Sequence, residues 1–273
     1  MGHLIQTVKA QSIGSVIDLG DSLPCTMKCL TQNDLLCEVV VKFKENLWGP
    51  IALVNELVAG LLAQKFQLPS PEPVLVYVSE ELAHSINSTT ILPNVLVTPG
   101  IHFGTIRVPT PFPQPTLDLI LLTHNIDDFP RIIVFDTLVR NMDRNNPWNF
   151  LIVRPDFAPS RLYLSIIDHT HCFGEPWWDE SILLYIEDTI INCLPNMAER
   201  IHGEDPFREA FEMFKILTSD LIKEILEVIP SEWGLPEPFR KALTRFLLER
   251  ALHVEAILKK NIDLFPGWRL IYD

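Results

Sequence analysis

The residues best suited to chemistry lie between Asp143 and Asp168. Asp143 sits in a polar loop, Asn149 stands at the head of an apolar run, and Asp168 ends a second apolar run. Mg²⁺ prefers hard oxygen ligands, so an amide and a carboxylate at the ends of two adjacent strands would suit a metal-bound phosphate. Asp143 would accept the proton of an attacking hydroxyl. These types and this spacing favour phosphoryl transfer.

A structural interpretation of the same loop remains open. Asn and Asp favour turns because their side chains bond the local backbone, so Asp143, Asn145 and Asn146 also suit a plain turn. Asp168 fits that interpretation less well, because it follows the apolar run 162–167. A carboxylate at the end of a buried strand needs a cation or several hydrogen bonds.

Lys42 and Glu56 form a second candidate pair upstream. Lys42 lies within the apolar run 39–43, and Glu56 falls on a predicted helix among small apolar neighbours. Each buried charge would be costly alone and tolerable beside the other. In kinases such an ion pair holds the lysine against the phosphates of ATP. The alternative is a Lys42 that reaches solvent and a partly exposed Glu56.

The elements that must position these residues change in character along the chain. Apolar periodicity and turn residues predict strands at 15–19, 35–43 and 74–78, a helix at 51–66, and further strand and loop at 94–108. After the proline-rich segment 109–115 the pattern predicts helices at 117–123, 130–141 and 236–258, strands at 149–153 and 162–167, and mostly helix from 181 onward. This order predicts an α+β fold with two lobes.

The proline-rich segment marks the expected lobe boundary. We assign residues 1–112 to a strand-rich, nucleotide-binding N-lobe with one helix, and residues 113–273 to a helical C-lobe that carries the catalytic loop and metal site.

Composition narrows the function classes. The 273 residues are 47% hydrophobic, enough for a packed core, and carry a net charge of −13. This charge disfavours nucleic acid as the main ligand. No secretory signal or membrane-spanning run is seen. Five cysteines are most simply reduced thiols of a cytoplasmic protein, although Cys25, Cys29 and Cys37 leave a zinc site as an alternative.

Several of these features together resemble the HipA-like kinases, a group related in fold to protein and phosphoinositide kinases. They are the Val-Lys-Phe strand 41–43, the Asn-Glu pair 55–56, the Asn-x-Asp-Arg loop 141–144, the Ile-Asp-His run 167–169, and Ile-Pro-Ser-Glu-Trp at 229–233. The resemblance implies a two-lobed, protein-kinase-like fold. It also implies an ATP-dependent kinase that uses Mg²⁺, phosphorylates Ser or Thr of a protein substrate, and has an antitoxin-like partner.

The resemblance also implies residue roles. Lys42 and Glu56 become the pair that holds the phosphates, Asp143 the catalytic base, and Asp168 the principal Mg²⁺ ligand. The usual position of the metal-binding Asn, five residues after the base, is Trp148 here. We therefore choose Asn149, which directly precedes the strand, and keep Asn146 as the alternative.

The departures from the family pattern support a second hypothesis. Relatives commonly carry His two residues after the catalytic Asp, where this chain has Asn145. A binding module with a catalytically impaired kinase fold would show the same fold without transfer. A third, weaker hypothesis is a metal hydrolase built on Asp168, His169 and His171 with His102.

The chain lacks the glycine-rich motifs of known phosphate loops. The best candidates are Ser12, Gly14 and Ser15, or the run Gly20-Asp21-Ser22, whose backbone amides would meet phosphate. Gly and Ser are ordinary turn residues, so the composition is also compatible with a simple turn.

Overall fold

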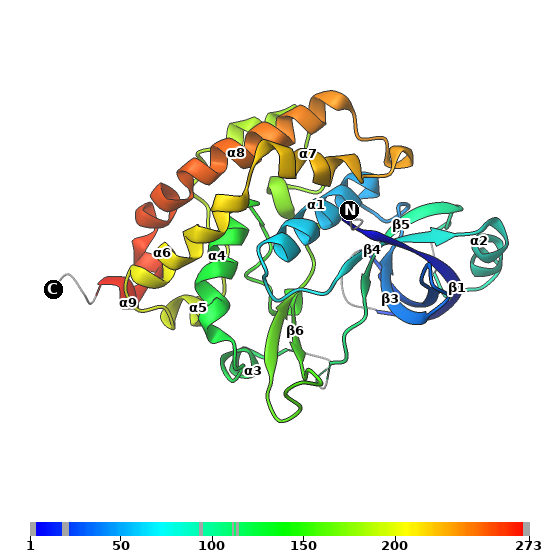
Figure 1. Cartoon of the computed structure of the whole chain (residues 1–273), viewed down its shortest axis with the longest axis horizontal. Coiled ribbons are helices and arrows are strands. Elements are labelled where there is room, and N and C mark those ends of the chain that lie inside the picture. Colours follow the sequence, from blue (N-terminus) through cyan, green and yellow to red (C-terminus); the bar gives the residue numbers. More distant parts are fainter. Residues whose placement is uncertain (1–3, 18–21, 93–94, 111, 113–114, 270–273) are drawn as a thin grey trace.

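The computed structural model describes residues 4–17, 22–92, 95–110, 112 and 115–269. Figure 1 shows a β-barrel at one end of the molecule and a layer of helices at the other, with the helix labelled α1 (Gly49–Lys65) between them. Among the described residues, no helix has both the length and the apolar character needed to cross a bilayer.

The N-terminal strands close into a barrel in the order β1-β2-β3-β5-β4. The barrel comprises β1 (Gln6–Val16), β2 (Cys25–Leu30), β3 (Leu36–Lys42), β4 (Pro73–Val78) and β5 (Gly100–Ile106). Neighbouring strands are antiparallel except β1 and β4, which run parallel. Alternate residues point inward and form the barrel core, including Val8, Cys25, Met27, Val39, Val41, Val74 and Val76.

Helix α1 (Gly49–Lys65) lies between the barrel and the other helices (Figure 1). Pro50 stands in its first turn, where a missing N–H does no harm. Every residue from Ala52 to Ala63 is buried, as expected of a helix covered on all sides. This burial places Glu56 in the interior.

The strand-rich part was predicted to contain one helix, and the structure shows a second. Helix α2 (Glu80–Asn87) begins at Ser79, whose side chain accepts a hydrogen bond from the Leu82 amide. It packs Ala83 and Ile86 onto the barrel. The helix is only eight residues long, too short for its periodicity to stand out in the sequence.

The first strands were also only partly predicted. The strand expected at 15–19 overlaps the end of β1, and residues 18 and 19 lie outside the described residues. Most of β1 and all of β2 went unpredicted. The outward face of β1 is largely polar, which hides the strand among turn-like residues.

The described residues of the C-terminal part form a hairpin and a set of packed helices. The hairpin pairs β6 (Phe150–Val153) with β7 (Tyr163–Ile166) in antiparallel register. The helices are α3 (Leu117–Leu121), α4 (Phe129–Leu138), α5 (Pro195–Glu199), α6 (Asp205–Phe211), α7 (Ser219–Glu227), α8 (Glu237–Lys260) and α9 (Pro266–Arg269). The mixed strand and helix content agrees with the predicted α+β class. Residues 111, 113 and 114 are not described, so the boundary at 112 stays a prediction.

Candidate active site

A cleft of about 670 Å³ collects most of the predicted site residues. Its polar lining includes Lys42 from β3, Glu56 from α1, the loop residues Asp143, Asn146 and Asn149, and Asp168 after β7. The pairing of β6 with β7 places Asn149 beside Asp168, because Asn149 O accepts a hydrogen bond from the Ile167 amide at 3.0 Å.

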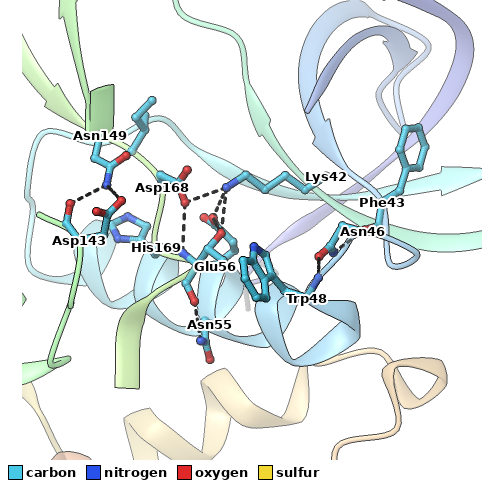
Figure 2. A network of polar contacts seen from close by, with 12 residues as sticks. Lys42, Phe43, Asn46, Trp48, Asn55, Glu56, Asp143, Asn149, Asp168 and His169 are labelled. Carbon is cyan, nitrogen blue, oxygen red and sulfur yellow. Dashed lines mark hydrogen bonds and ion pairs between the residues drawn. The ribbon is translucent and has the colours of Figure 1, made fainter. Parts of the chain in front are cut away.

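Lys42 lies at the centre of this site. Its ammonium group is 2.5 Å from Glu56 Oε1, 2.9 Å from Asp168 Oδ1 and 3.1 Å from Thr170 Oγ1. Figure 2 shows the side chain reaching between the two carboxylates. The predicted ion pair is therefore present, and Lys42 is only 9% exposed, which excludes the solvent-reaching alternative.

The charges of this cluster shift the pKa of each member. Burial lowers the pKa of Lys42, but the carboxylates of Asp168 and Glu56 outweigh burial and leave it above its ordinary value. Burial raises the pKa of Asp168, yet Lys42 dominates and holds it well below the usual value. For Glu56 burial wins over Lys42, and the pKa is raised. Lys42 and Asp168 are therefore both charged at neutral pH.

Asp168 adopts an unusual backbone conformation. Its φ of 58° lies in the left-handed region, which Asp tolerates better than most non-glycine residues. The Thr170 amide donates to Asp168 Oδ1 at 3.3 Å, and the side chain is 33% exposed toward the cleft. The turn presents a charged carboxylate at the end of a buried strand.

Asp143 and Asn149 form a second polar cluster in the cleft. The side-chain amide of Asn149 donates to both the backbone carbonyl and the carboxylate Oδ2 of Asp143, each at 2.8 Å. Asn146 reaches the same carboxylate at 3.3 Å, and its own Oδ1 accepts the Trp148 amide. Within the described part of the chain, no hydrogen bond uses Asn149 Oδ1, so this oxygen is available to a ligand.

The sequence assigned no role to the residues that hold the loop in place, although Arg144 belongs to the Asn-x-Asp-Arg motif. Arg144, 1% exposed, pairs with buried Asp136 of α4 at 2.9 Å. The same guanidinium donates to Asn149 O at 2.6 Å and to Ile167 O at 2.7 Å. It thus ties the loop to both strands of the hairpin. A carboxylate in the apolar run 129–139 was the available signal.

The predicted phosphate-loop residues lie within β1, not in a free loop. Ser15 lines the cleft, whereas Ser12 and Gly14 are not among its lining residues. Thr26 Oγ1 accepts the Ser15 amide at 2.9 Å, and a Cβ on Gly14 would meet the same oxygen at 2.5 Å. The close contact with β2 thus explains why position 14 is a glycine. In the alternative run, Ser22 lines the cleft, and Gly20 and Asp21 lie outside the described residues.

The histidines of the hydrolase hypothesis do not converge. His102 accepts the Lys44 amide at Nδ1, 3.2 Å away, while buried His169 faces Arg144 at 3.3 Å. His171 lines the cleft beside Trp48, with ring centroids 5.9 Å apart. Among residues that the structure describes, no three His, Cys, Asp or Glu are grouped to hold a metal.

The cleft suits a nucleotide with a magnesium ion. Its volume falls in the range of small-molecule sites, and apolar walls are supplied by Val40, Phe103, Ile106, Leu151 and Ile166. Asn149 Oδ1 and the Asp168 carboxylate are hard oxygen donors of the kind that Mg²⁺ prefers. The residues present therefore fit both groups.

A barrel joined to a helical region across a cleft with a lysine–carboxylate cluster is the arrangement of a kinase-like protein. A family model described as HipA-like kinase matches residues 27–265. The chain therefore belongs to the HipA-like kinase family. This membership supports an activity of the kinase type, the transfer of a phosphoryl group.

The comparison with solved structures supports the fold through a bacterial kinase. The Helicobacter pylori proinflammatory kinase CtkA superposes with a TM-score of 0.58 at 14% identity, covering 94% of this chain and 99% of that one. The Golgi casein kinase with Mn/ADP bound gives a TM-score of 0.49 at 13% identity, covering 96% and 75%. No curated protein matches the sequence.

Proposed function

We propose that this protein is an ATP- and Mg²⁺-dependent kinase that phosphorylates Ser or Thr of a protein substrate. The observation that carries the proposal is Lys42, which is buried between Glu56 and an ionised Asp168. In kinases a Lys–Glu ion pair and a metal-binding Asp are both in place at the phosphates of ATP, and Lys42, Glu56 and Asp168 supply these three groups here.

Five polar residues of the cleft then have a role. Glu56 holds Lys42, and Lys42 donates to the phosphates of ATP. Asn149 and Asp168 would hold the Mg²⁺, which supplies positive charge to the phosphoryl group being transferred. Asp143 accepts the proton of the acceptor hydroxyl, and the Asn149 amide fixes its carboxylate.

The acceptor and the partner rest on the family alone. Membership of the HipA-like kinases supports a protein substrate with Ser or Thr at the site of transfer, and an antitoxin-like partner. A cytoplasmic location is part of the same proposal.

A binding module without transfer is the second candidate. Asn145 is exposed in this loop and occupies the position where relatives carry His. The loop is instead held by the buried Arg144–Asp136 pair, so its geometry does not depend on that His. This favours the active kinase over the impaired one.

Calorimetric titration with ATP, with and without Mg²⁺, tests the proposal. The wild-type protein should bind ATP more tightly when Mg²⁺ is present, and Asp168→Asn should lose most of that gain. Thermal unfolding of both proteins controls for the fold. Absence of ATP binding by folded wild-type protein would point to a module that recognises another partner.

A further inference from the structure

Asn55 is a fully buried polar side chain to which the proposed mechanism gives no role. It lies on α1 one residue before Glu56, and its exposed fraction is 0%. Its amide nitrogen donates to Thr170 O at 2.7 Å, Cys172 O at 3.0 Å and Glu175 O at 3.3 Å. Its carbonyl oxygen accepts the Trp178 indole N–H at 2.7 Å.

A single side chain thus ties four points of the segment 170–178 to α1. This segment begins two residues after Asp168, and its 3₁₀ turn at Cys172–Gly174 contains a residue with positive φ, Phe173. Irregular backbone of this kind leaves carbonyls without partners of their own. A carboxamide suits the position because its two N–H groups serve the three carbonyls, with one N–H shared between two of them, and its carbonyl oxygen accepts.

The same contacts connect Asn55 to the catalytic cluster through Thr170. Asn55 donates to the carbonyl of Thr170. The Thr170 hydroxyl in turn donates to Glu56 at 2.8 Å and accepts from Lys42. The Thr170 amide donates to Asp168 Oδ1. Figure 2 shows Asn55 beneath the Lys42, Glu56 and Asp168 cluster, on the same helix as Glu56.

We propose that Asn55 is a positioning residue that holds the segment 170–178 in place and thereby sets Asp168 for metal binding. This inference rests on the proposed function. In many kinases, phosphorylation orders the segment after the metal-binding Asp by creating new contacts to Arg. Here Thr170 is the only hydroxyl residue in the run 169–178, and it is 3% exposed. The segment is therefore held without modification.

Two variants and one control test the role. Asn55→Ala removes all four contacts. Trp178→Phe removes only the indole bond and keeps a ring against Phe173 and Phe239. Asn87→Ala is the matched control, because Asn87 also clamps a loop by accepting from and donating to Val97, but it lies outside the cleft lining.

The readouts are amide hydrogen exchange of the ligand-free protein and calorimetric binding of ATP with and without Mg²⁺. In Asn55→Ala, exchange in 170–178 should rise about tenfold or more. Mg²⁺-dependent ATP affinity should fall on the order of tenfold, as for residues that support metal ligands, while metal-free ATP affinity stays unchanged. A merely structural loss would weaken both affinities alike.

Unchanged exchange and unchanged metal dependence in Asn55→Ala would overturn the proposal. If that variant does not fold, Trp178→Phe tests the proposal instead. Exchange in 170–178 must then rise in Trp178→Phe and remain at the wild-type level in Asn87→Ala. A phosphate on the segment 169–178 in active protein would also contradict it. If wild-type protein fails to bind ATP with Mg²⁺, the proposed function is lost, but hydrogen exchange still decides whether Asn55 holds the segment.

Discussion

Lys42 donates to three oxygens in a nearly closed environment, so its charge and that of Glu56 depend on one another. Glu56 is 3% exposed and would be left without its cation if Lys42 were replaced. Removing one partner of a buried pair is costly because the other charge stays uncompensated. Under the proposed function, stability and catalysis are therefore coupled at Lys42.

Lys42→Met should lower the free energy of unfolding by about 3 kcal/mol at pH 7. Adding Glu56→Gln should restore part of that loss, since Glu56, the more deeply buried of the two carboxylates that Lys42 pairs with, is then replaced by an uncharged group. Urea denaturation of both single variants and the double variant measures this coupling. Strict additivity of the two substitutions would show that the pair does not interact.

Asp143→Asn should reduce turnover by about 10²- to 10⁴-fold, the usual contribution of a catalytic base. ATP binding and thermal stability should change little, because Asn keeps the shape and Asn149 can still donate to it. Steady-state kinetics with a protein acceptor gives the measurement. Asp156→Asn, at an exposed position of the β6–β7 connection, is the control and should retain wild-type turnover.

At the scale of elements, the loop 141–149 and the β6–β7 hairpin behave as one unit. Arg144 joins them by bonding the carbonyls of Asn149 and Ile167 while pairing with Asp136. Helix α1 contributes the opposite side through Asn55 and Glu56. The site is thus built on packed elements, which hold side chains more precisely than free loops do.

Arg144→Ala should lower the free energy of unfolding by about 3–5 kcal/mol, because Asp136 would stay buried without its cation. Chemical denaturation measures the loss. Arg154→Ala is the matched control, since Arg154 is exposed after β6, and it should stay within about 0.5 kcal/mol of wild type. Equal effects of the two substitutions would contradict the role given to Arg144.

For the whole molecule, the barrel and the helices are joined outside the cleft as well. Glu232 accepts from Lys44 at 2.8 Å and from the Ile101 amide at 2.7 Å, and the Trp233 indole donates to Ile101 O. The run 229–233, part of the resemblance to the family, thus joins the helical part to the barrel. Near this junction, His102 is buried and accepts a hydrogen bond from the Lys44 amide, so protonation there would disturb the same region.

Stability should therefore fall as pH drops from 6.5 to about 4. Burial, assisted by Lys44, lowers the pKa of His102 from 6.5 to about 4, so within this window the unfolded state takes up the proton and the folded state does not. The loss is on the order of 3 kcal/mol. Burial likewise lowers the pKa of His169 and steepens the trend.

Urea denaturation across this pH range tests the effect. His102→Gln should flatten the decline between pH 6.5 and 4, whereas His84→Gln, exposed on α2, should leave the slope unchanged. An identical slope in wild type and His102→Gln would remove His102 as the cause.

Residues whose type conflicts with their local pattern could be found from the sequence. Lys42 in an apolar strand, Glu56 on an apolar helix and Asp168 after an apolar strand each signal a buried charge that needs a partner. The resemblance to HipA-like kinases came from the same positions, and the family is confirmed. Polarity against an apolar background is a local property, which a single sequence displays.

Beyond the predicted Lys42–Glu56 pair, only the tertiary structure decided which groups meet. Asn55 bonds residues more than a hundred positions away, and the partners of Arg144 come from a helix and two strands. The strand assignment of Ser12 and Gly14 likewise depended on the pairing of β1 with β2. A hydrogen-bonded contact is set by distance in space, and no spacing along the chain encodes it.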